Sequence, residues 1–327
     1  MLRRSILQAL AATPLLPLAA HAVGPAPAPL SPPVTLTIGY QKVGHLAPMI
    51  LIAEPLQKLG VDAKLVEFVR YADARTALLA GSLDVASIGP GDLAIALAQG
   101  SKDIVGLMGV GASDKYVIGR TGVKLDTWAD LAGKTVAIAP GSAVWFQFAA
   151  TLTENKIPYT SFHAVNIQGG GSNFDQALKA GDVDALVTWE PFESVPVMAG
   201  YGFFAKNLEY GHSQAVGAEL GMIVTTRDAL AHKKAAVQRF VWAYLQQEEA
   251  LRASPPAFAA AYARFTGLDP AVAAKAAEVI TLGGVITPSQ IERQAKLFYS
   301  LGVIPKDVSS EVPAAWDGSL VQQAEGA

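Results

Sequence analysis

Three glycine-containing stretches of the sequence could offer backbone N–H groups to a ligand. They are Gly89-Pro90-Gly91-Asp92, Gly141-Ser142 and Gly169-Gly170-Gly171. N–H groups at the start of a helix attract small anions and polar head groups. Neither the Walker spacing nor G-x-G-x-x-G occurs in these stretches, so they do not indicate a nucleotide site. The pattern predicts a site for a small anion or polar group, with plain helix caps and a flexible connection as the alternatives.

Side chains of other types follow the same predicted strand ends. Trp145 and Trp189 come just after predicted ligand loops, where we expect them to wall a cleft. Lys42 directly follows the first predicted strand and is a candidate counter-ion for an anion. Asp92 could accept a hydrogen bond from a ligand amine or hydroxyl, or act as an N-cap. For the tryptophans the alternative is core packing, and for Lys42 it is a solvated surface position.

Patterns for catalysis or metal binding do not occur. The chain has no cysteine, which excludes thiol nucleophiles and thiolate metal sites. Pro140-Gly141-Ser142 does not match G-x-S-x-G, and no nucleophile is paired with a histidine at a recognisable spacing. His45, His163, His212 and His232 show no paired ligand spacing. We therefore predict no catalytic residue, no metal and no cofactor.

Length and charge restrict the class of protein. The 327 residues are 51% hydrophobic, which is enough for one large core or two smaller ones. The net charge of −3 lacks the basic footprint of a nucleic-acid-binding protein.

The N-terminus has the pattern of an export signal. Arg3-Arg4 precedes an apolar run that Pro14 and Pro17 interrupt, and Ala20-His21-Ala22 resembles a cleavage site. We predict a signal peptide at residues 1–22, of Sec or twin-arginine type, and a Pro/Ala-rich linker at residues 23–33. The mature protein is then expected in the periplasm.

Strand and helix patterns alternate along the rest of the chain. Strands are predicted at residues 34–38, 63–69, 85–88, 104–110, 135–139 and 185–188, with extended segments at 116–120, 162–167 and 215–226. Helices are predicted at 45–59, 71–80, 92–99 and 143–155 and before Gly181, and the pattern from Asp228 onward is helical. This alternation indicates an α/β fold with mostly parallel sheets.

One sequence segment occurs twice, one hundred residues apart. Ala77-Leu78-Leu79-Ala80-Gly81-Ser82-Leu83-Asp84 is followed by Ala177-Leu178-Lys179-Ala180-Gly181-Asp182-Val183-Asp184. In each copy a glycine stands where a helix would end in a left-handed residue. Ile38 and Ile138 continue the correspondence at the same offset. The repeat predicts two similarly built α/β lobes.

Three motifs resemble those of a known family. They are Ile38-Gly39-Tyr40-Gln41-Lys42, Leu78-Leu79-Ala80-Gly81-Ser82-Leu83-Asp84-Val85-Ala86 and Trp189-Glu190-Pro191-Phe192. Their order is similar to that in the periplasmic substrate-binding proteins of nitrate, taurine and aliphatic-sulfonate ABC importers. The resemblance implies a type II periplasmic binding fold with a ligand cleft between two lobes. Lobe one would comprise residues 34–115 and 216–327, with the C-terminal helices, and lobe two residues 116–215. The crossing segments would lie near residues 111–120 and 215–222.

The resemblance also implies the ligand-binding positions. They are Tyr40, Gln41, Lys42, Gly89, Pro90, Gly91 and Asp92 in lobe one and Ser142, its neighbours Val144 and Trp145, Trp189 and Glu190 in lobe two, to which we add Ser113 and Gly170. Many sulfonate-type members have Thr-Gly-Asp where this chain has Gly89-Pro90-Gly91-Asp92. Since proline lacks an N–H donor, this difference leaves the ligand open.

The expected function is that of a monomeric solute-binding protein that delivers a ligand to an ABC permease by hinge closure. A small organic anion of the sulfonate or taurine type is the first ligand class, and an aromatic or heterocyclic compound of the phthalate or pyrimidine type is the second. An exported ligand sensor is the alternative role. The chain also resembles thiamine-pyrimidine synthases, but these depend on a cysteine-rich motif that is missing here.

Overall fold

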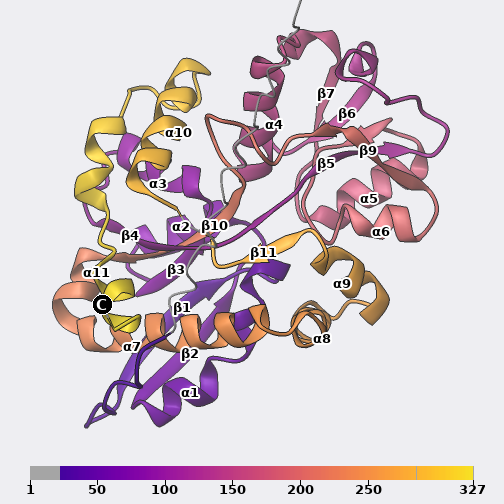
Figure 1. The fold of residues 1–327 in the computed structure, drawn as a ribbon. Helices are drawn as coiled ribbons and strands as arrows, with labels where there is room; N and C mark the ends of the chain where they lie inside the picture. The colour runs from indigo at the N-terminus through magenta and orange to yellow at the C-terminus, as the bar shows by residue number, and fades with distance from the viewer. Residues whose placement is uncertain (1–22, 285, 327) are drawn as a thin grey trace, which may run out of the picture.

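Two β-sheets with helices on both faces make up the structure, a computed structural model that describes residues 23–326 without Val285 (Figure 1). The predicted signal peptide lies outside the described residues. None of the helices in the described part of the chain combines the length and the apolar character needed to cross a membrane.

The first sheet has the strand order β11-β4-β10-β3-β1-β2. Its strands are β1 (Val34–Tyr40), β2 (Val61–Glu67), β3 (Val85–Ile88), β4 (Ile104–Ser113), β10 (Glu219–Thr226) and β11 (Ile280–Leu282). β1 to β4 run in one direction, because β10 pairs antiparallel with both β3 and β4. All four residues of β3 are buried, as the sequence predicted for a strand covered on both faces.

The second sheet has the order β7-β6-β8-β5-β9. Its strands are β5 (Tyr116–Arg120), β6 (Thr135–Ile138), β7 (His163–Asn166), β8 (Ala185–Leu186) and β9 (Gly202–Glu209). Only β5 runs against the other four described strands, so the predicted mostly parallel α/β fold is confirmed. The chain passes between the sheets twice, from Ser113 to Tyr116 and from Glu209 to Glu219.

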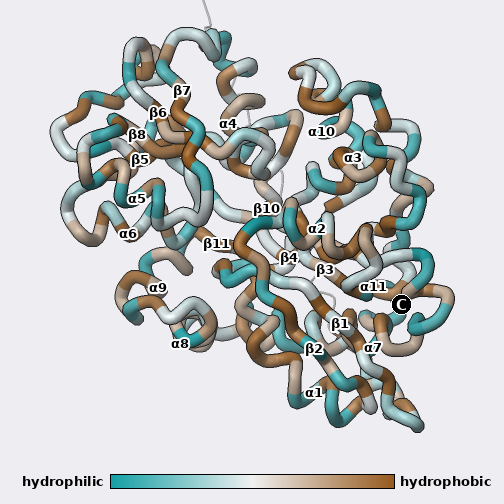
Figure 2. The backbone as a smooth tube through the Cα atoms, turned by 180° about the vertical axis from the view of Figure 1, so that it is seen from behind, coloured by the Kyte–Doolittle hydropathy of each residue, from teal (hydrophilic) through white to brown (hydrophobic). Residues whose placement is uncertain are grey.

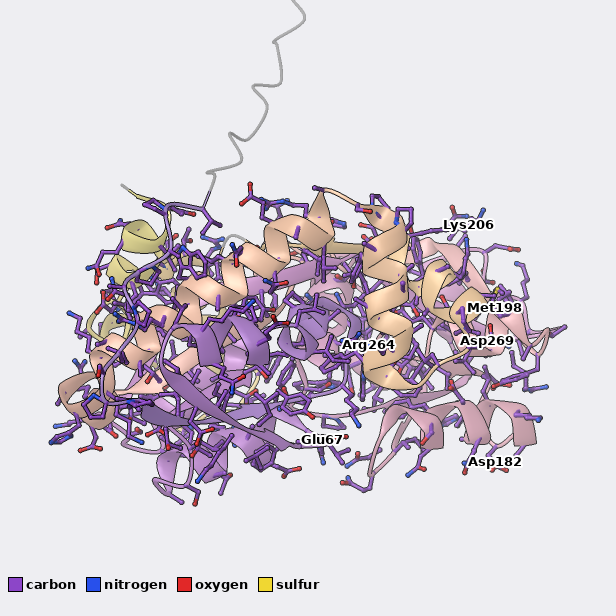
Figure 3. The ribbon with its side chains drawn as sticks, turned by 90° about the horizontal axis from the view of Figure 1, so that it is seen from below. Glu67, Asp182, Met198, Lys206, Arg264 and Asp269 are labelled. Carbon is purple, nitrogen blue, oxygen red and sulfur yellow. The ribbon has the colours of Figure 1, made fainter. Side chains whose placement is uncertain are left out.

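The helices pack around these sheets and form contacts between them. They are α1 (Ala53–Lys58), α2 (Tyr71–Leu79), α3 (Pro90–Ala98), α4 (Ala143–Glu154), α5 (Gly171–Ala180), α6 (Ser194–Met198), α7 (Arg227–Arg252), α8 (Pro255–Thr266), α9 (Pro270–Ala277), α10 (Pro288–Ser300) and α11 (Ser319–Ala324). Short 3₁₀ turns are η1 (Gly44–Ile50), η2 (Trp128–Leu131), η3 (Tyr159–Ser161), η4 (Ser309–Glu311) and η5 (Pro313–Ala315). Among the C-terminal helices, α10 packs on α3 beside the first sheet. α9 contacts α6 beside the second sheet, in the region that Asp269 and Met198 mark in Figure 3.

The hydrophobic cores follow the two sheets. Apolar stretches in Figure 2 coincide largely with the strands, whereas polar stretches lie on the outer helices and loops. A large cluster centred on β1, η1 and α7 forms one side of the first sheet, and smaller clusters flank the second sheet. Both sheets therefore have packed faces that hold their strand ends in place.

The repeated segment forms the same structure in both sheets. After the helix ends at a left-handed Gly81 or Gly181, the aspartate three residues later bonds to the neighbouring strand. Asp84 Oδ2 accepts the Thr37 N–H at 2.8 Å, and Asp184 Oδ2 accepts the Thr135 N–H at 3.0 Å. A cation pairs with each carboxylate, Lys233 at 2.8 Å and Arg120 at 2.9 Å.

The pairing registers revise one correspondence of the repeat. Ile38 pairs with Val85 in the first sheet, and Val136 pairs with Ala185 in the second. Ile38 therefore matches Val136, and the proposed match with Ile138 is two residues too far along the chain.

Several predicted elements differ from the observed ones. The single helix predicted at 45–59 is divided into η1 and α1, because Pro48 and Pro55 lack the N–H that a continuous helix needs. The predicted helical pattern after Asp228 is interrupted by β11, which completes the edge of the first sheet. β9 was not predicted, and β8 ends two residues earlier than expected.

The predicted linker packs on the first-sheet side without forming a helix or strand. The Leu30 N–H donates to the Leu59 carbonyl at 2.9 Å, and the Gly24 N–H donates to the Ala324 carbonyl at 2.7 Å. The Trp242 indole N–H donates to the Gly24 carbonyl at 2.9 Å. These bonds attach residues 23–33 to the end of α1, to α7 and to α11.

We predict that Asp84→Ala lowers the free energy of unfolding by about 1–3 kcal/mol, because it leaves the Thr37 N–H and Lys233 without their acceptor. Urea unfolding of the purified protein measures this change. Asp182→Ala is the matched control, since Asp182 is exposed within the second copy of the repeated segment (Figure 3). Equal losses in the two variants would contradict the role given to Asp84.

Candidate functional site

A cleft between the two sheets is lined by residues that follow six strands. Its empty volume is about 730 Å³, space open to solvent included. The lining residues are Gln41, Val43 and His45 after β1; Val69, Arg70, Tyr71 and Ala72 after β2; Asp92 after β3; Ala139, Gly141, Ser142, Ala143 and Val144 after β6; Gly169 after β7; Trp189 after β8; and Leu220 in β10. The carboxyl ends of parallel strands are where open α/β sheets bind ligands.

Two helices begin at this cleft from opposite sides. α2 starts at Tyr71 on the first-sheet side, and α4 starts at Ala143 on the second-sheet side. The first N–H groups of each helix have no intrahelical acceptor, and the helix dipole makes this end positive. Ser142 is the N-cap of α4, as predicted, and its Oγ accepts the Trp145 N–H at 3.3 Å. The N–H groups of Ala143 and Val144 therefore remain available to an anion.

Gln41 presents a side-chain donor at the floor of the cleft. Its Oε1 accepts the hydroxyl of the buried Ser87 at 2.6 Å, which fixes the orientation of the amide. Its Nε2 is buried and has no hydrogen-bond partner among residues 23–326 apart from Val285. A buried donor without a partner is costly, so this amide is suited to a ligand acceptor.

His45 and Tyr71 form a neutral hydrogen-bonded pair in the wall. The distance from His45 Nε2 to Tyr71 Oη is 2.5 Å. Burial, assisted by the positive charge of Lys115, lowers the pKa of His45 to about 3. Burial and the nearby Asp92 raise the pKa of Tyr71. The pair therefore links η1 to the start of α2 without adding charge to the cleft.

The start of α3 differs from the prediction. Gly89 is the N-cap and Pro90 is the first residue of the helix, so Asp92 is the third helical residue rather than the cap. The Asp92 carboxylate accepts the Gly89 N–H at 3.0 Å and pairs with Arg75. Gly91 faces Phe298, because a Cβ added there would lie 2.4 Å from that ring. The N–H groups of Gly89 and Asp92 are thus satisfied within this loop, Pro90 has none, and Asp92 alone of the four lines the cleft.

Arg70 connects the two sides at the rim of the cleft. Its Nη1 donates to Gln168 Oε1 at 3.4 Å, and Gln168 precedes the glycines at the start of α5. Val69 lies beside Gly170 across the same gap, since a Cβ on that glycine would be 3.7 Å from Val69 Cγ1. Arg70 is therefore placed to cover a ligand and to contribute a positive charge.

The structure brings five of the predicted ligand-binding residues to the cleft: Gln41, Asp92, Ser142, Val144 and Trp189. The others have different partners. Tyr40 stacks on Phe265, Lys42 pairs with the exposed Glu67 at 2.8 Å, and the Trp145 indole donates to Tyr159. The Ser113 carbonyl accepts from Lys115, Glu190 accepts from Ser194, and Gly170 is the N-cap of α5.

Residues after β2 and one residue within η1 were missed by the sequence reasoning. Val69, Arg70 and Tyr71 follow β2 at its carboxyl end, where open α/β sheets bind ligands, whereas Gln41 was identified through the family resemblance. The predicted second strand extended to Val69, two residues beyond the end of β2, and so concealed them. His45 was considered as a metal ligand only. Within the described residues no group of three or more acidic or histidine side chains is arranged to hold a metal ion.

Comparisons with known proteins show which family and which solved structures this chain is similar to. The family described as NMT1/THI5 like matches residues 55–257. A protein of Escherichia coli (strain K12) named as an aliphatic sulfonates-binding protein is 27% identical over 173 residues, which is 52% of this chain. That alignment spans about half of the relative's own length, 54%.

Solved structures share the fold over nearly the whole chain. The alkanesulfonate-binding protein SsuA from Xanthomonas axonopodis pv. citri, bound to MOPS, has a TM-score of 0.73 and 23% identity, covering 88% of this chain and 99% of that one. The periplasmic nitrate-binding protein NrtA from Synechocystis PCC 6803 has a TM-score of 0.71 and 15% identity, covering 92% and 90%. These neighbours are binding proteins, not enzymes, and they show the fold of periplasmic binding proteins.

We predict that His45 stays neutral from pH 8 to pH 5, because its buried imidazole has a pKa of about 3. Histidine ¹⁵N shifts across a pH titration measure this directly. The unfolded chain protonates this imidazole near pH 6.5, so its contribution to stability is present above that pH and is lost as the pH falls toward 3. A midpoint for His45 above pH 5 would contradict the burial assigned to it.

Proposed function

The chain belongs to the NMT1/THI5-like family, and from that premise we propose that it is a periplasmic solute-binding protein that delivers a small organic anion to an ABC permease. The observation that supports this most strongly is the start of α2 and α4 at one cleft, from opposite sides. Relatives named for sulfonate and nitrate binding carry the same fold, and their ligands are anions.

The rest of the cleft supports a ligand with an apolar body. Trp189, Val43, Val144 and Leu220 line it together with the polar groups. An aromatic or branched aliphatic anion could therefore place its charged group at the helix starts and its body against these side chains. Trp189 favours the aromatic class, which the sequence left as the second alternative.

Closure of the cleft would follow from contacts on both sides. We take residues 34–115 and 216–327 as lobe one and residues 116–215 as lobe two. A ligand that accepts from α2 and Gln41 of lobe one and from α4 of lobe two gains its full set of hydrogen bonds only when the lobes approach. Its better contacts with the closed form shift the population toward that form, which the permease would then recognise.

We predict that organic anions bind at least about tenfold more tightly than uncharged analogues of the same shape, because charged acceptors make the stronger bonds to helix N-termini. Isothermal titration calorimetry with butanesulfonate, benzenesulfonate, phthalate and nitrate, against benzenesulfonamide and a pyrimidine, measures this. Binding confined to the uncharged compounds would overturn the anion assignment.

Gln41→Leu is expected to weaken the tightest binder of that panel by about tenfold, because it removes the buried donor at the floor of the cleft. Ser87→Ala is the matched control, since it breaks the same Ser87–Gln41 bond but keeps the amide N–H groups. If both variants lose affinity equally, the loss comes from disturbed packing, and Gln41 does not contact the ligand.

A further inference from the structure

One ion pair in the wall of the cleft has no role in the binding scheme above. Arg75 of α2 donates through Nη1 to Asp92 Oδ1 of α3, and their side chains are only 12% and 7% exposed. Asp92 lines the cleft, whereas Arg75 lies behind it. Taking two opposite charges out of water is expensive, so a buried pair beside a binding site invites a functional explanation.

The charges around the cleft show what the pair does. Among the described lining residues Asp92 is the only acid, and Arg70 is the only charged base because His45 is neutral. An uncompensated Asp92 would cancel the charge of Arg70 and oppose an anion. With Arg75 present, the sum over Arg70, Arg75 and Asp92 is one positive charge.

We propose that Arg75 sets the charge selectivity of the cleft: by neutralising Asp92 it leaves Arg70 and the helix N-termini unopposed, so that the site prefers an organic ligand with a single negative charge. This inference rests on the proposed function and refines its ligand class. Arg75 is a positioning residue in this account, since it acts on the ligand through Asp92.

Removal of Arg75 and removal of the Asp92 charge change the summed charge of Arg70, Arg75 and Asp92 in opposite directions. Arg75→Gln also removes an influence that lowers the pKa of Asp92, so the variants are compared at pH 9. With Asp92 ionised there, Arg75→Gln brings the sum to zero and is expected to weaken benzenesulfonate binding by about tenfold, the size of a unit charge about 10 Å away at an effective dielectric constant near 20. Asp92→Asn raises the sum to two positive charges. It is expected to strengthen binding by a similar factor and to shift preference toward benzenedisulfonate. Arg75→Lys keeps the charge and should rescue binding.

The double variant separates charge from structure. Arg75→Gln combined with Asp92→Asn restores a sum of one positive charge, so benzenesulfonate affinity and its ratio to benzenedisulfonate affinity should return close to the original values. A merely structural pair would leave the double variant as weak as Arg75→Gln.

A pH profile of the unmodified protein provides an independent readout. Burial raises the pKa of Asp92 to about 6, against the lowering influence of Arg75, the Gly89 N–H and Arg70. Besides Arg70, the other titratable residues among the described lining of the cleft are Tyr71 and His45, both neutral from pH 5 to 8. Asp92 loses its charge as the pH falls through 6, so affinity for benzenesulfonate, whose own charge is constant, should rise between pH 8 and pH 5.

Asp92→Asn is the control for this profile. Burial also raises the pKa of Glu190 to about 7 and that of Asp175 to about 8, and the effects of these two groups persist in the variant. The difference between the two profiles therefore belongs to Asp92.

The experiment is calorimetry with benzenesulfonate and benzenedisulfonate on the unmodified protein and these variants. Unchanged affinity ratios in Arg75→Gln and Asp92→Asn, with benzenesulfonate still bound, would overturn the role of Arg75 and leave the proposed function intact. Failure of every anion to bind the unmodified protein would overturn both. If Arg75→Gln does not fold, the Asp92→Asn ratio and the two pH profiles decide the question.

Discussion

The structure depends on a constraint at the start of two helices. The first N–H groups of α2 and α4 have no acceptor within their helices, and both sets face one cleft. When the cleft is open, these N–H groups can bond to water. Closure of the cleft would bury them, and each buried donor left without an acceptor costs about 1–3 kcal/mol. An anionic ligand supplies acceptors to both helices at once. In the proposed function, this requirement would make the ligand part of the closed structure.

The repeated segment explains how the N-termini of α2 and α4 come to lie on opposite sides of one cleft. In both sheets a left-handed glycine ends a helix, and an aspartate three residues later bonds to the neighbouring strand. This bond aligns the strand ends, so the loops after β1 and β3 meet at one edge, as do those after β6 and β8. The two edges lie on opposite sides of the cleft, and residues that follow six strands line it. Local hydrogen bonds of the repeat thus determine the position of the site.

The architecture and five of the sixteen residues that line the cleft could be predicted from the sequence, for identifiable reasons. Gln41, Ser142 and Trp189 follow buried strands directly, and strand ends are visible as apolar runs followed by glycine or polar residues. Lys42 and Glu190 occupy equivalent places, but their choice between the cleft and partners such as Glu67 and Ser194 depends on tertiary contacts. β11 is three residues long within a helical region, and it exists because the edge of β4 lies beside it. Arg75 carries no local signal, since its role depends on an acid seventeen residues away.

The central claim is that the cleft retains an organic anion. Native mass spectrometry of the protein, purified without any added ligand, tests it most directly by identifying what the cleft binds in the cell. The account predicts a one-to-one complex with a small organic acid that carries a single negative charge and an apolar body. Retention of a neutral or cationic compound in that cleft would contradict it.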